Sequence, residues 1–434
     1  MGKIVSDFLK GDLFKGDKVV WMIYFFLCMI SLVEVYSASS SLTFGSGNHW
    51  DPMIKQAGFL LMGLVVIIVA HRIPCRMYML IGPLLLFVSI LLLIYTSIFA
   101  GAINNANRWI SLGPISFQPS EIAKAGLIMS VAVVLAKTQA ERKIVKGGKT
   151  IIETGAIKGK RNLAFKIIAW MVVIVCGLIA PENFSTAAIL GTVIVAMMFI
   201  GRIPKDLMFK SFLALLAVGA VMVTMMFTIK ESTLNKKIPF GHRMTTWKHR
   251  ILEFGKDENK FTSAYVFGNA QVAHANMAVA NSNIIGRGPG NSVERDFLSH
   301  AESDFIFSII VEELGILGAM FILFLYITLL VRAGKISRKC QRFFPAFLVL
   351  GVGIMLTLQA IVHMGVAVNL FPVTGQPLPF ISRGGTSILF SSLYIGVILS
   401  VSRYADKVSE TKAEPAEKTM VGETDEYYNQ VNMA

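Results

Sequence analysis

The sequence predicts an all-α, polytopic integral membrane protein with about ten transmembrane helices and one large extracytoplasmic loop between helices 7 and 8. Composition gives the first reason: of 434 residues, 54% are apolar and only 16% are charged, and the mean hydropathy is +0.62. These values lie outside the range of ordinary soluble domains. The second reason is that apolar runs of about 18 to 25 residues recur along the chain, and each is long enough to cross a bilayer as a helix.

The predicted membrane domain occupies residues 19–403. Its spans are 19–38, 55–71, 77–99, 118–136, 165–180, 184–201, 206–229, 304–331, 343–369 and 384–403. The first run resembles a signal-peptide core, but it is longer and many spans follow, so we interpret it as an uncleaved helix. Residues 1–18 precede it, and the polar segment 404–434 is expected to be a disordered tail.

Positive charge predicts the orientation of these spans. Lysines and arginines gather before the first span, after the second, and in the connectors 137–166 and 332–339. With an even number of spans these segments share one side, so both termini are predicted to be cytoplasmic. The formal net charge of +14 therefore indicates topology and not nucleic-acid binding. The four cysteines lie in spans or in these connectors, so no disulfide framework is implied.

The loop 230–303 is too long to be expected without structure of its own, and a long loop is often functional. It is basic and includes Arg250. Because long loops largely escape the topology rule, its charge indicates an anionic substrate at the outer face. Glycines 286, 288 and 290 near its end are either turn residues or positions where backbone approaches a phosphate or sugar. No strand precedes them, so they are not a nucleotide-binding fingerprint.

Asp304 stands where the eighth span begins, and a carboxylate there is costly unless something needs it. One interpretation is a first-turn carboxylate favoured by the helix dipole. The other is a reactive site, because His300 and Glu302 lie close by. Glu312 and Glu313 follow about 12–14 Å further along the helix axis. For them a structural salt bridge and catalysis remain equal alternatives.

Two further groups carry charge at outer ends of spans. Glu121 and Lys124 are spaced i, i+3 at the start of the fourth span, which suits an intrahelical ion pair. Alternatively, Lys124 pairs with Asp304, which lies at a compatible depth. Arg108 and Trp109 are either interfacial belt residues or a sugar-stacking platform beside a phosphate ligand. No His, Cys and Asp spacing is typical of a zinc site.

Six segments together resemble the SEDS family (shape, elongation, division and sporulation) over residues 36–403. They read RWISLG at 108–113, ISFQPSEIAK at 115–124, GPGNS at 288–292, DFIF at 304–307, EELG at 312–315 and PVTGQPLPFISRGGTS at 372–387. The resemblance implies ten membrane helices and an enzyme that polymerises lipid II into glycan strands. In that reaction transfer inverts the anomeric centre and undecaprenyl pyrophosphate leaves. A class B penicillin-binding protein is the implied transpeptidase partner.

The resemblance also implies roles for individual residues. The family's essential aspartate falls on Asp304, which is expected to act as general base. The expected substrate-binding residues are Arg108, Trp109, Ser120, Glu121, Lys124, Arg250, Asn291, Glu302 and Ser382. Mg²⁺ or Mn²⁺ is a possible cofactor, with Asp304 as its possible ligand, and no organic cofactor is expected.

This chain departs from the family pattern at several motif positions. In the segment 299–303 the His and Glu are exchanged, segment 180–186 lacks the usual motif, and Arg383 replaces an aromatic or apolar residue. The division subfamily is closer than the elongation subfamily, which predicts septal wall synthesis at the division site, with other division proteins as partners. The alternatives are the elongation role, a scaffold, or a lipid II flippase. A flippase needs ionisable residues along a path to both faces, whereas here they gather at the outer face.

Overall fold

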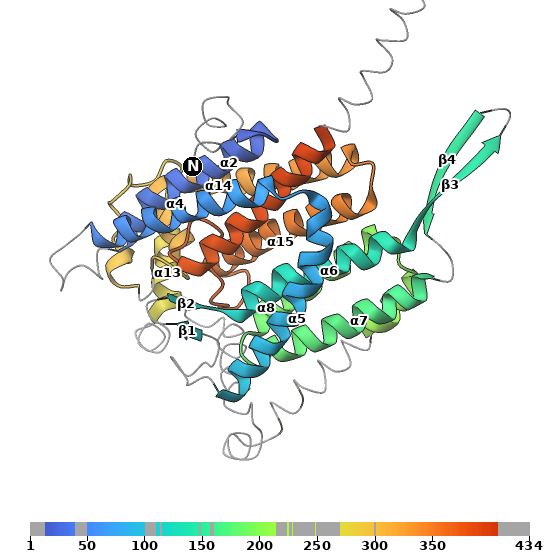
Figure 1. Ribbon diagram of the computed structural model, residues 1–434. Coiled ribbons are helices and arrows are strands. Elements are labelled where there is room, and N and C mark those ends of the chain that lie inside the picture. The colour runs from blue at the N-terminus through green and yellow to red at the C-terminus, as the bar shows by residue number, and fades with distance from the viewer. Residues whose placement is uncertain are drawn as a thin grey trace, which may run out of the picture.

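The computed structural model is a bundle of membrane-length helices (Figure 1). It describes residues 14–39, 50–99, 110–112, 115–146, 149–156, 160–213, 270–298 and 301–406, with the isolated residues 224, 228 and 248. In this part of the chain, eight helices are long and apolar enough to cross a membrane. They are α2 (Lys18–Ala38), α4 (Asp51–Arg72), α5 (Cys75–Phe99), α6 (Pro119–Thr138), α7 (Lys160–Ile179), α14 (Ile306–Lys339), α15 (Phe343–Ala367) and the C-terminal helix Gly385–Asp406.

These helices confirm the predicted fold class. Every predicted span other than the seventh coincides with one of them or with the shorter apolar helix α8 (Phe184–Ile200). For the seventh span, residues 205–213 are helical and almost all of the remainder lies outside the described residues. The main difference in bounds is α14, which runs to Lys339 and not to 331.

Exposed apolar side chains on the outer helices mark the surface that faces lipid. On α5 and α7, Leu80 is 78% exposed and Trp170 is 68% exposed. In contrast α6 is buried on nearly all sides, because it packs against α5, α7, α8 and α15. Polar groups on α6 are therefore inside the protein, where they need partners.

Two short antiparallel hairpins accompany the helices and were not predicted. Strands β1 (Ile110–Leu112) and β2 (Ile115–Phe117) pair Ile110 with Phe117 and lead directly into α6. Strands β3 (Gln139–Lys146) and β4 (Lys149–Ala156) lie within the basic connector 137–166 and project away from the bundle (Figure 1). Both hairpins lie outside the predicted spans, so the membrane domain remains helical.

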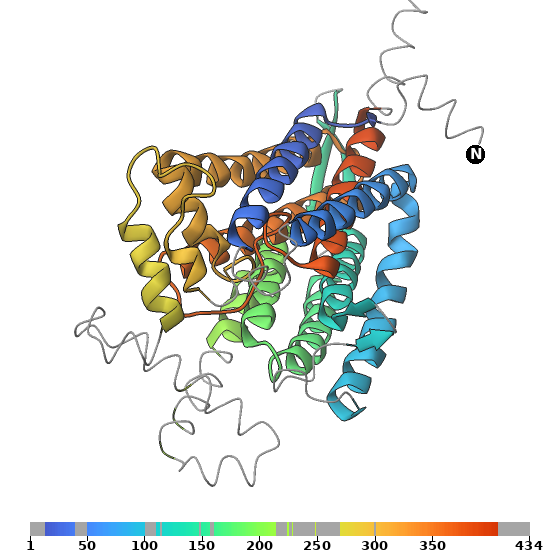
Figure 2. The ribbon, with the colours of Figure 1, turned by 90° about the vertical axis from the view of Figure 1, so that its left-hand side faces the viewer.

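The end of the large loop is structured as predicted for 230–303, although residues 230–269 lie outside the described part except for residue 248. It forms α13 (Ala270–Ala280), which packs beside α14 (Figure 2), and the 3₁₀ turn η2 (Glu294–Asp296). This segment then passes into α14. Helix α14 is broken at Gly315, where φ is 68° and ψ is −171°.

The two ends of the bundle have different contacts. At one end Asp17 caps α2 and pairs with Arg332 of α14, and Arg403 donates to the carbonyl of Arg72. These are the segments that the charge pattern predicts on one common side. At the other end lie the starts of α4, α6, α8 and α14 and the segment after α15. Those candidate site residues that the structure describes are at this second end.

Candidate active site

The site is built around the turn that follows α15, residues 372–385. Gly375 and Phe380 both have positive φ, 64° and 68°. Phe380 tolerates this conformation because its side chain is buried and packs edge-on against Tyr24 of α2. The amide of Leu378 donates to the hydroxyl of Ser382 at 2.8 Å, which closes the turn. The turn is therefore a fixed structural unit at the end of the bundle.

Two hydrogen bonds join this turn to the backbone immediately before Asp304. The amide of Arg383 donates to the carbonyl of Glu302 at 2.8 Å, and the hydroxyl of Ser382 donates to the carbonyl of Ser303 at 2.7 Å. Ser382 is only 1% exposed. Its hydroxyl accepts from Leu378, and its single proton is donated to Ser303, so in this conformation it has no proton left to donate to a ligand. It holds the backbone that carries Asp304.

Asp304 is half-buried and precedes Phe305, the N-cap of α14, so it is not itself the cap. Gly375 packs against its carboxylate: a Cβ at that position would lie 3.6 Å from Oδ2 of Asp304. The neighbouring residue of the turn is also held, because Nδ1 of the buried His363 of α15 bonds the carbonyl of Gln376 at 2.6 Å. Among the described residues the Asp304 carboxylate has no hydrogen bond or ion pair.

Lys124 does not pair with Asp304 in the described structure, so that predicted pairing is wrong here. Its ammonium lies 2.7 Å from Glu121 on the same helix and donates to Gln359 of α15 at 3.4 Å. Lys124 is fully buried and Glu121 is 6% exposed. A buried charge takes the nearest compensating partner, and the carboxylate one turn away is nearer than one on another helix. The intrahelical interpretation is the correct one.

The Glu121–Lys124 pair is connected to the turn through amide side chains. Gln359 donates to the carbonyl of Pro377 at 3.0 Å, and Gln376 donates to Thr186 of α8 at 2.6 Å. The sequence analysis named neither glutamine. Gln359 carried a usable signal, because a polar amide within an apolar span needs a partner inside the protein. Gln376 is in a loop and gave no such signal.

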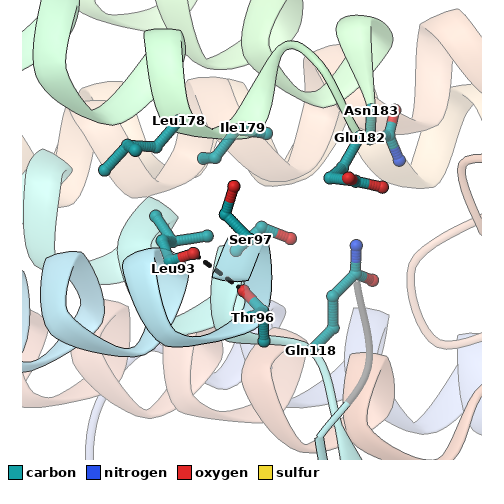
Figure 3. Close-up of a pocket in the computed structure, with 9 residues that line it drawn as sticks. Leu93, Thr96, Ser97, Gln118, Leu178, Ile179, Glu182 and Asn183 are labelled. Carbon is teal, nitrogen blue, oxygen red and sulfur yellow. Dashed lines mark hydrogen bonds between the residues drawn. The ribbon is translucent and has the colours of Figure 1, made fainter. Parts of the chain in front are cut away.

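Ser120 lines a small cavity. This cavity lies between α5, α6 and the turn from α7 to α8 (Figure 3). This cavity has a volume of about 20 Å³ and is lined by Thr96, Gln118, Glu182 and Asn183 among others. Ser120 is 4% exposed, and its hydroxyl oxygen has no partner in the described structure. A space of this size and polarity holds a water molecule but not a sugar.

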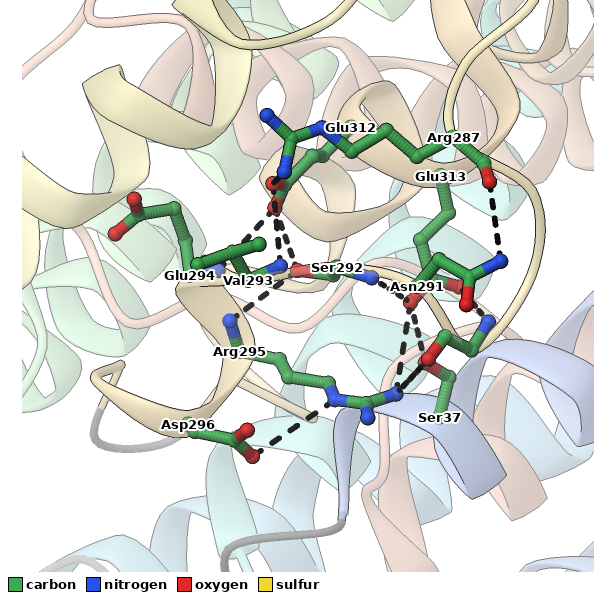
Figure 4. Close-up of polar contacts among 11 residues, drawn as sticks. Ser37, Arg287, Asn291, Ser292, Val293, Glu294, Arg295, Asp296, Glu312 and Glu313 are labelled. Carbon is green, nitrogen blue, oxygen red and sulfur yellow. Dashed lines mark hydrogen bonds and ion pairs between the residues drawn. The ribbon is translucent and has the colours of Figure 1, made fainter.

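The glycine-rich loop fills the break in α14 (Figure 4). Gly286 and Gly288 have φ of 86° and 89°. The amides of Arg287 and Gly288 donate to the carbonyls of Glu312 and Glu313 at 3.0 and 2.8 Å. The loop thus supplies donors to carbonyls at the end of the first part of α14, where the helix is interrupted. A Cβ at Gly286 would lie 2.2 Å from the carbonyl oxygen of Glu313, so the close approach requires glycine.

The side chains of Glu312 and Glu313 hold the same loop from within, and both are fully buried. Glu312 accepts from the hydroxyl of Ser292 at 2.5 Å and from the amide of Val293 at 3.2 Å. Glu313 accepts from the amides of Gly290 and Ser292 at 2.9 and 3.2 Å. It also accepts from the hydroxyl of Ser37 of α2 (Figure 4). Of the two alternatives for these carboxylates, the structural one fits the geometry.

The loop's own polar groups are largely committed to this arrangement. Arg295 lies 4.0 Å from Glu313, and Arg287 lies 3.4 Å from Glu312. Asn291, a predicted substrate ligand, is exposed and donates to the carbonyl of Arg287 at 3.1 Å. The loop amides bind internal carboxylates, which favours turn residues over a backbone that approaches a phosphate or sugar, the other alternative. We call residues 286–295 with Glu312 and Glu313 the carboxylate clamp.

The remaining predicted site residues are only partly placed. Glu302 is 6% exposed and forms an ion pair of 3.6 Å with Arg383. Arg108, Trp109, Arg250 and His300 lie outside the described residues. In the described part of the chain, no three His, Cys, Asp or Glu side chains are close enough together to hold a metal ion. Asp304 is therefore not part of a preformed metal centre made by these residues.

Fold and site define a polytopic helical membrane protein with a polar site at one end of its bundle, where a fixed turn holds the Asp304 carboxylate, which has no hydrogen bond or ion pair to any described residue. The profile of the FtsW/RodA/SpoVE family, described as cell cycle proteins, matches residues 17–407. The chain belongs to this family, as its motifs indicated.

Individual relatives agree with this assignment. A protein of Enterococcus hirae named "Probable peptidoglycan glycosyltransferase FtsW" is 30% identical over 93% of this chain and 96% of its own length. A Bacillus subtilis protein of the same name is 29% identical over 89% of this chain and 90% of its own.

Solved structures share the fold. A chain of a peptidoglycan synthase complex has a TM-score of 0.66 at 21% identity, covering 90% of this chain and 98% of that chain. The rod shape determining protein RodA of Thermus thermophilus has a TM-score of 0.57 at 21% identity, covering 89% of this chain and 97% of its own.

Proposed function

We propose that this protein is a peptidoglycan glycosyltransferase that polymerises lipid II at the outer face of the cytoplasmic membrane, for septal wall synthesis in cell division. The observation that carries the proposal is Asp304: a half-buried carboxylate with no partner in the described structure, on backbone fixed by the turn after α15. Membership in the family and the names of its relatives support the reaction class and the division role.

In this reaction Asp304 removes the proton from the 4-hydroxyl of the acceptor sugar. The oxygen attacks the anomeric carbon of the donor from the face opposite the leaving group, so the centre inverts. The bond from that carbon to the pyrophosphate breaks, and undecaprenyl pyrophosphate leaves with the bonding electrons. The proton stays on Asp304 until water takes it. Pyrophosphate needs little protonation to leave, so a single carboxylate suffices.

The leaving group needs positive charge near it. Arg108 and Arg250 are the proposed sources, with Trp109 as a platform for a sugar. Lys124 is buried and already balanced by Glu121, so we assign this pair to support of the turn and not to direct contact. Mg²⁺ or Mn²⁺, if bound, would take Asp304 together with substrate phosphate oxygens, as such ions commonly do, and would neutralise phosphate charge.

We propose that both termini are cytoplasmic and that the site end of the bundle faces outward. The basic segments 137–166 and 332–339 support this orientation. The proposed partners are a class B penicillin-binding protein, which would cross-link the new strand, and other division proteins. The likeness to a chain of a peptidoglycan synthase complex supports an assembly of this kind.

The test is polymerisation of labelled lipid II by the purified full-length protein, with and without its transpeptidase partner, for wild type and Asp304→Ala. The variant must insert and bind the partner normally. Long glycan strands from wild type and none from the variant are expected. Strands from both would remove Asp304 as the base but leave the enzyme. Strands from neither, with partner and metal present, would favour a flippase or a scaffold.

A further inference from the structure

A polar cavity of about 300 Å³ lies beside the candidate site, between the start of α4 and the turn after α15. It is lined by Lys55, Gln56, Phe59, Glu302, Ser303, Arg383, Gly384 and Gly385. Ser303 is the residue immediately before Asp304, so the lining of the cavity includes the backbone neighbour of the proposed base. Its volume is at the lower end of the range for small-molecule sites. The proposed reaction so far gives it no role.

The charges in its lining favour an anion. Lys55 and Arg383 are cations, and Glu302 is the one carboxylate among the lining residues. Arg383 lies 3.6 Å from Glu302, which is longer than the 2.7–2.9 Å of a good charge-assisted bond. Since a guanidinium has five donors, most of them remain for a ligand. Glu302 thus holds the arginine in place and leaves most of its N–H donors for a ligand.

Lys55 is also available. Its side chain is 59% exposed and pairs with Asp51 one turn earlier, at 2.6 Å. Exposed i, i+4 pairs of this kind contribute little free energy, so the ammonium can turn to a bound anion at small cost. Asp51 does not line the cavity, which makes it possible to remove the pair without removing the cation.

The walls of the cavity are preformed. Gln56 is 1% exposed and donates to Ser31 of α2 at 2.8 Å, and Ser31 donates to the carbonyl of Ile381 at 3.2 Å. These bonds fix α4 against the turn. The side-chain amide oxygen of Gln56, Oε1, is buried without a partner in the described structure, which is unfavourable unless a donor arrives.

An aromatic ring forms the apolar part of the wall. Phe59 packs so closely on Gly385 that a Cβ there would lie 2.6 Å from the ring. The glycine therefore lets the ring approach the backbone of the turn. An aromatic surface beside two cations and the buried amide oxygen of Gln56 suits a sugar with an attached oxyanion. Small-molecule sites commonly combine apolar area with a few placed polar groups.

We propose that this cavity is a subsite for an oxyanion attached to the sugar substrate, in which Lys55 and Arg383 bind the oxyanion and Phe59 covers an apolar face. The identity of the substrate rests on the proposed function. Two parts of a lipid-linked muropeptide have this chemistry: its diphosphate and the carboxylates of its peptide. Arg383 is one position at which this chain departs from the family pattern. It forms an ion pair with Glu302, which lies in the segment 299–303, where the chain also departs from that pattern.

Equilibrium binding to the full-length protein in nanodiscs tests the subsite, by isothermal titration calorimetry. The probes are farnesyl diphosphate, a muramyl pentapeptide with free carboxylates, and the same muramyl pentapeptide fully amidated. The variants are Arg383→Gln and Lys55→Gln, with Asp51→Asn as control. Each lost cation is expected to raise the Kd of one anionic probe about tenfold, as for a charged hydrogen bond. Asp51→Asn should leave that Kd unchanged or lower it.

The outcomes separate the two sources and the two proposals. If the variants bind farnesyl diphosphate more weakly than wild type does, the diphosphate is the group that occupies the subsite. If they bind the free-acid muramyl pentapeptide more weakly, and the amidated pentapeptide does not bind to wild type, the peptide carboxylates occupy it. Unchanged binding of both anionic probes in well-folded variants overturns the subsite. Cation-dependent binding by a protein that makes no strands keeps the subsite and rejects the polymerase. Strand synthesis by both variants with an unchanged KM for lipid II keeps the polymerase and rejects the subsite. Arg383→Gln keeps the backbone bond to Glu302, and Arg383→Lys should restore part of the affinity.

Discussion

Two carboxylates near the start of α14 differ in how their oxygens are used, although the sequence presents them alike. Glu313, in the carboxylate clamp, is fully buried and accepts from the amides of Gly290 and Ser292. Asp304 is half-buried and has no such donor among the described residues. A carboxylate whose lone pairs are occupied by fixed donors is a structural anchor, whereas an unoccupied one is free to take a proton. The donors around a carboxylate therefore decide its role more than its position in the span does.

The largest expected effect comes from replacing each of these two carboxylates by its amide and comparing the results. Asp304→Asn should lower the rate of strand synthesis by roughly 10²- to 10⁴-fold, the usual worth of a general base, with little change in thermal stability. Glu313→Gln should instead destabilise the protein by roughly 1–3 kcal/mol, because an amide NH₂ would face backbone donors. Initial rates and thermal unfolding in detergent measure both. A stable but inactive Glu313→Gln variant would contradict the comparison.

The buried ion pair on α6 is expected to behave as a structural unit. Lys124→Met leaves Glu121 buried without its counter-charge, which typically costs about 3–5 kcal/mol. The double variant Glu121→Gln with Lys124→Met should recover most of that loss, since no unpaired charge remains. Thermal unfolding of the two single variants and the double variant gives the coupling. If the double variant is stable yet inactive, Lys124 or Glu121 takes part in the reaction directly.

Two glycines of the carboxylate clamp separate backbone strain from steric contact. Gly290 has φ of 84° and open space around it, so Gly290→Ala should cost only the left-handed conformation, about 1–2 kcal/mol. Gly286→Ala carries the same strain and also a Cβ 2.2 Å from the carbonyl oxygen of Glu313. It should be clearly the more destabilising of the two in thermal unfolding. Equal losses would mean that the loop does not fill the break in α14 as described.

The smallest expected effect concerns Ser382, which holds the backbone before Asp304. Ser382→Ala removes the bond to Ser303 and should lower kcat several-fold while KM stays within about twofold, at a stability cost of about 1 kcal/mol. Ser400→Ala is the matched control, because that hydroxyl also donates to a backbone carbonyl, of Ile73, but at the opposite end. A similar fall in kcat for the control would show that the effect is general loosening and not positioning of Asp304.

The sequence alone determined the membrane spans, and with them the family. Apolar length is a local property that a span carries by itself, so α2 and α15 could be located without any knowledge of their neighbours. The same holds for the motif around Asp304. For the carboxylates within spans, the sequence established that each needed a reason, because an ionisable group in an apolar run is costly wherever it packs.

Tertiary structure decided what each of those groups does. Lys124 binds Glu121 and not Asp304, and Glu302 meets Arg383 from a segment far along the chain. Hydrogen bonds and ion pairs act over about 3–4 Å, so their partners depend on how helices distant in sequence pack together. Spacing along the chain cannot supply that distance. The fold could therefore be predicted from local properties, whereas the difference between Glu313, which is held by backbone donors, and Asp304, which has none among the described residues, required the packed structure.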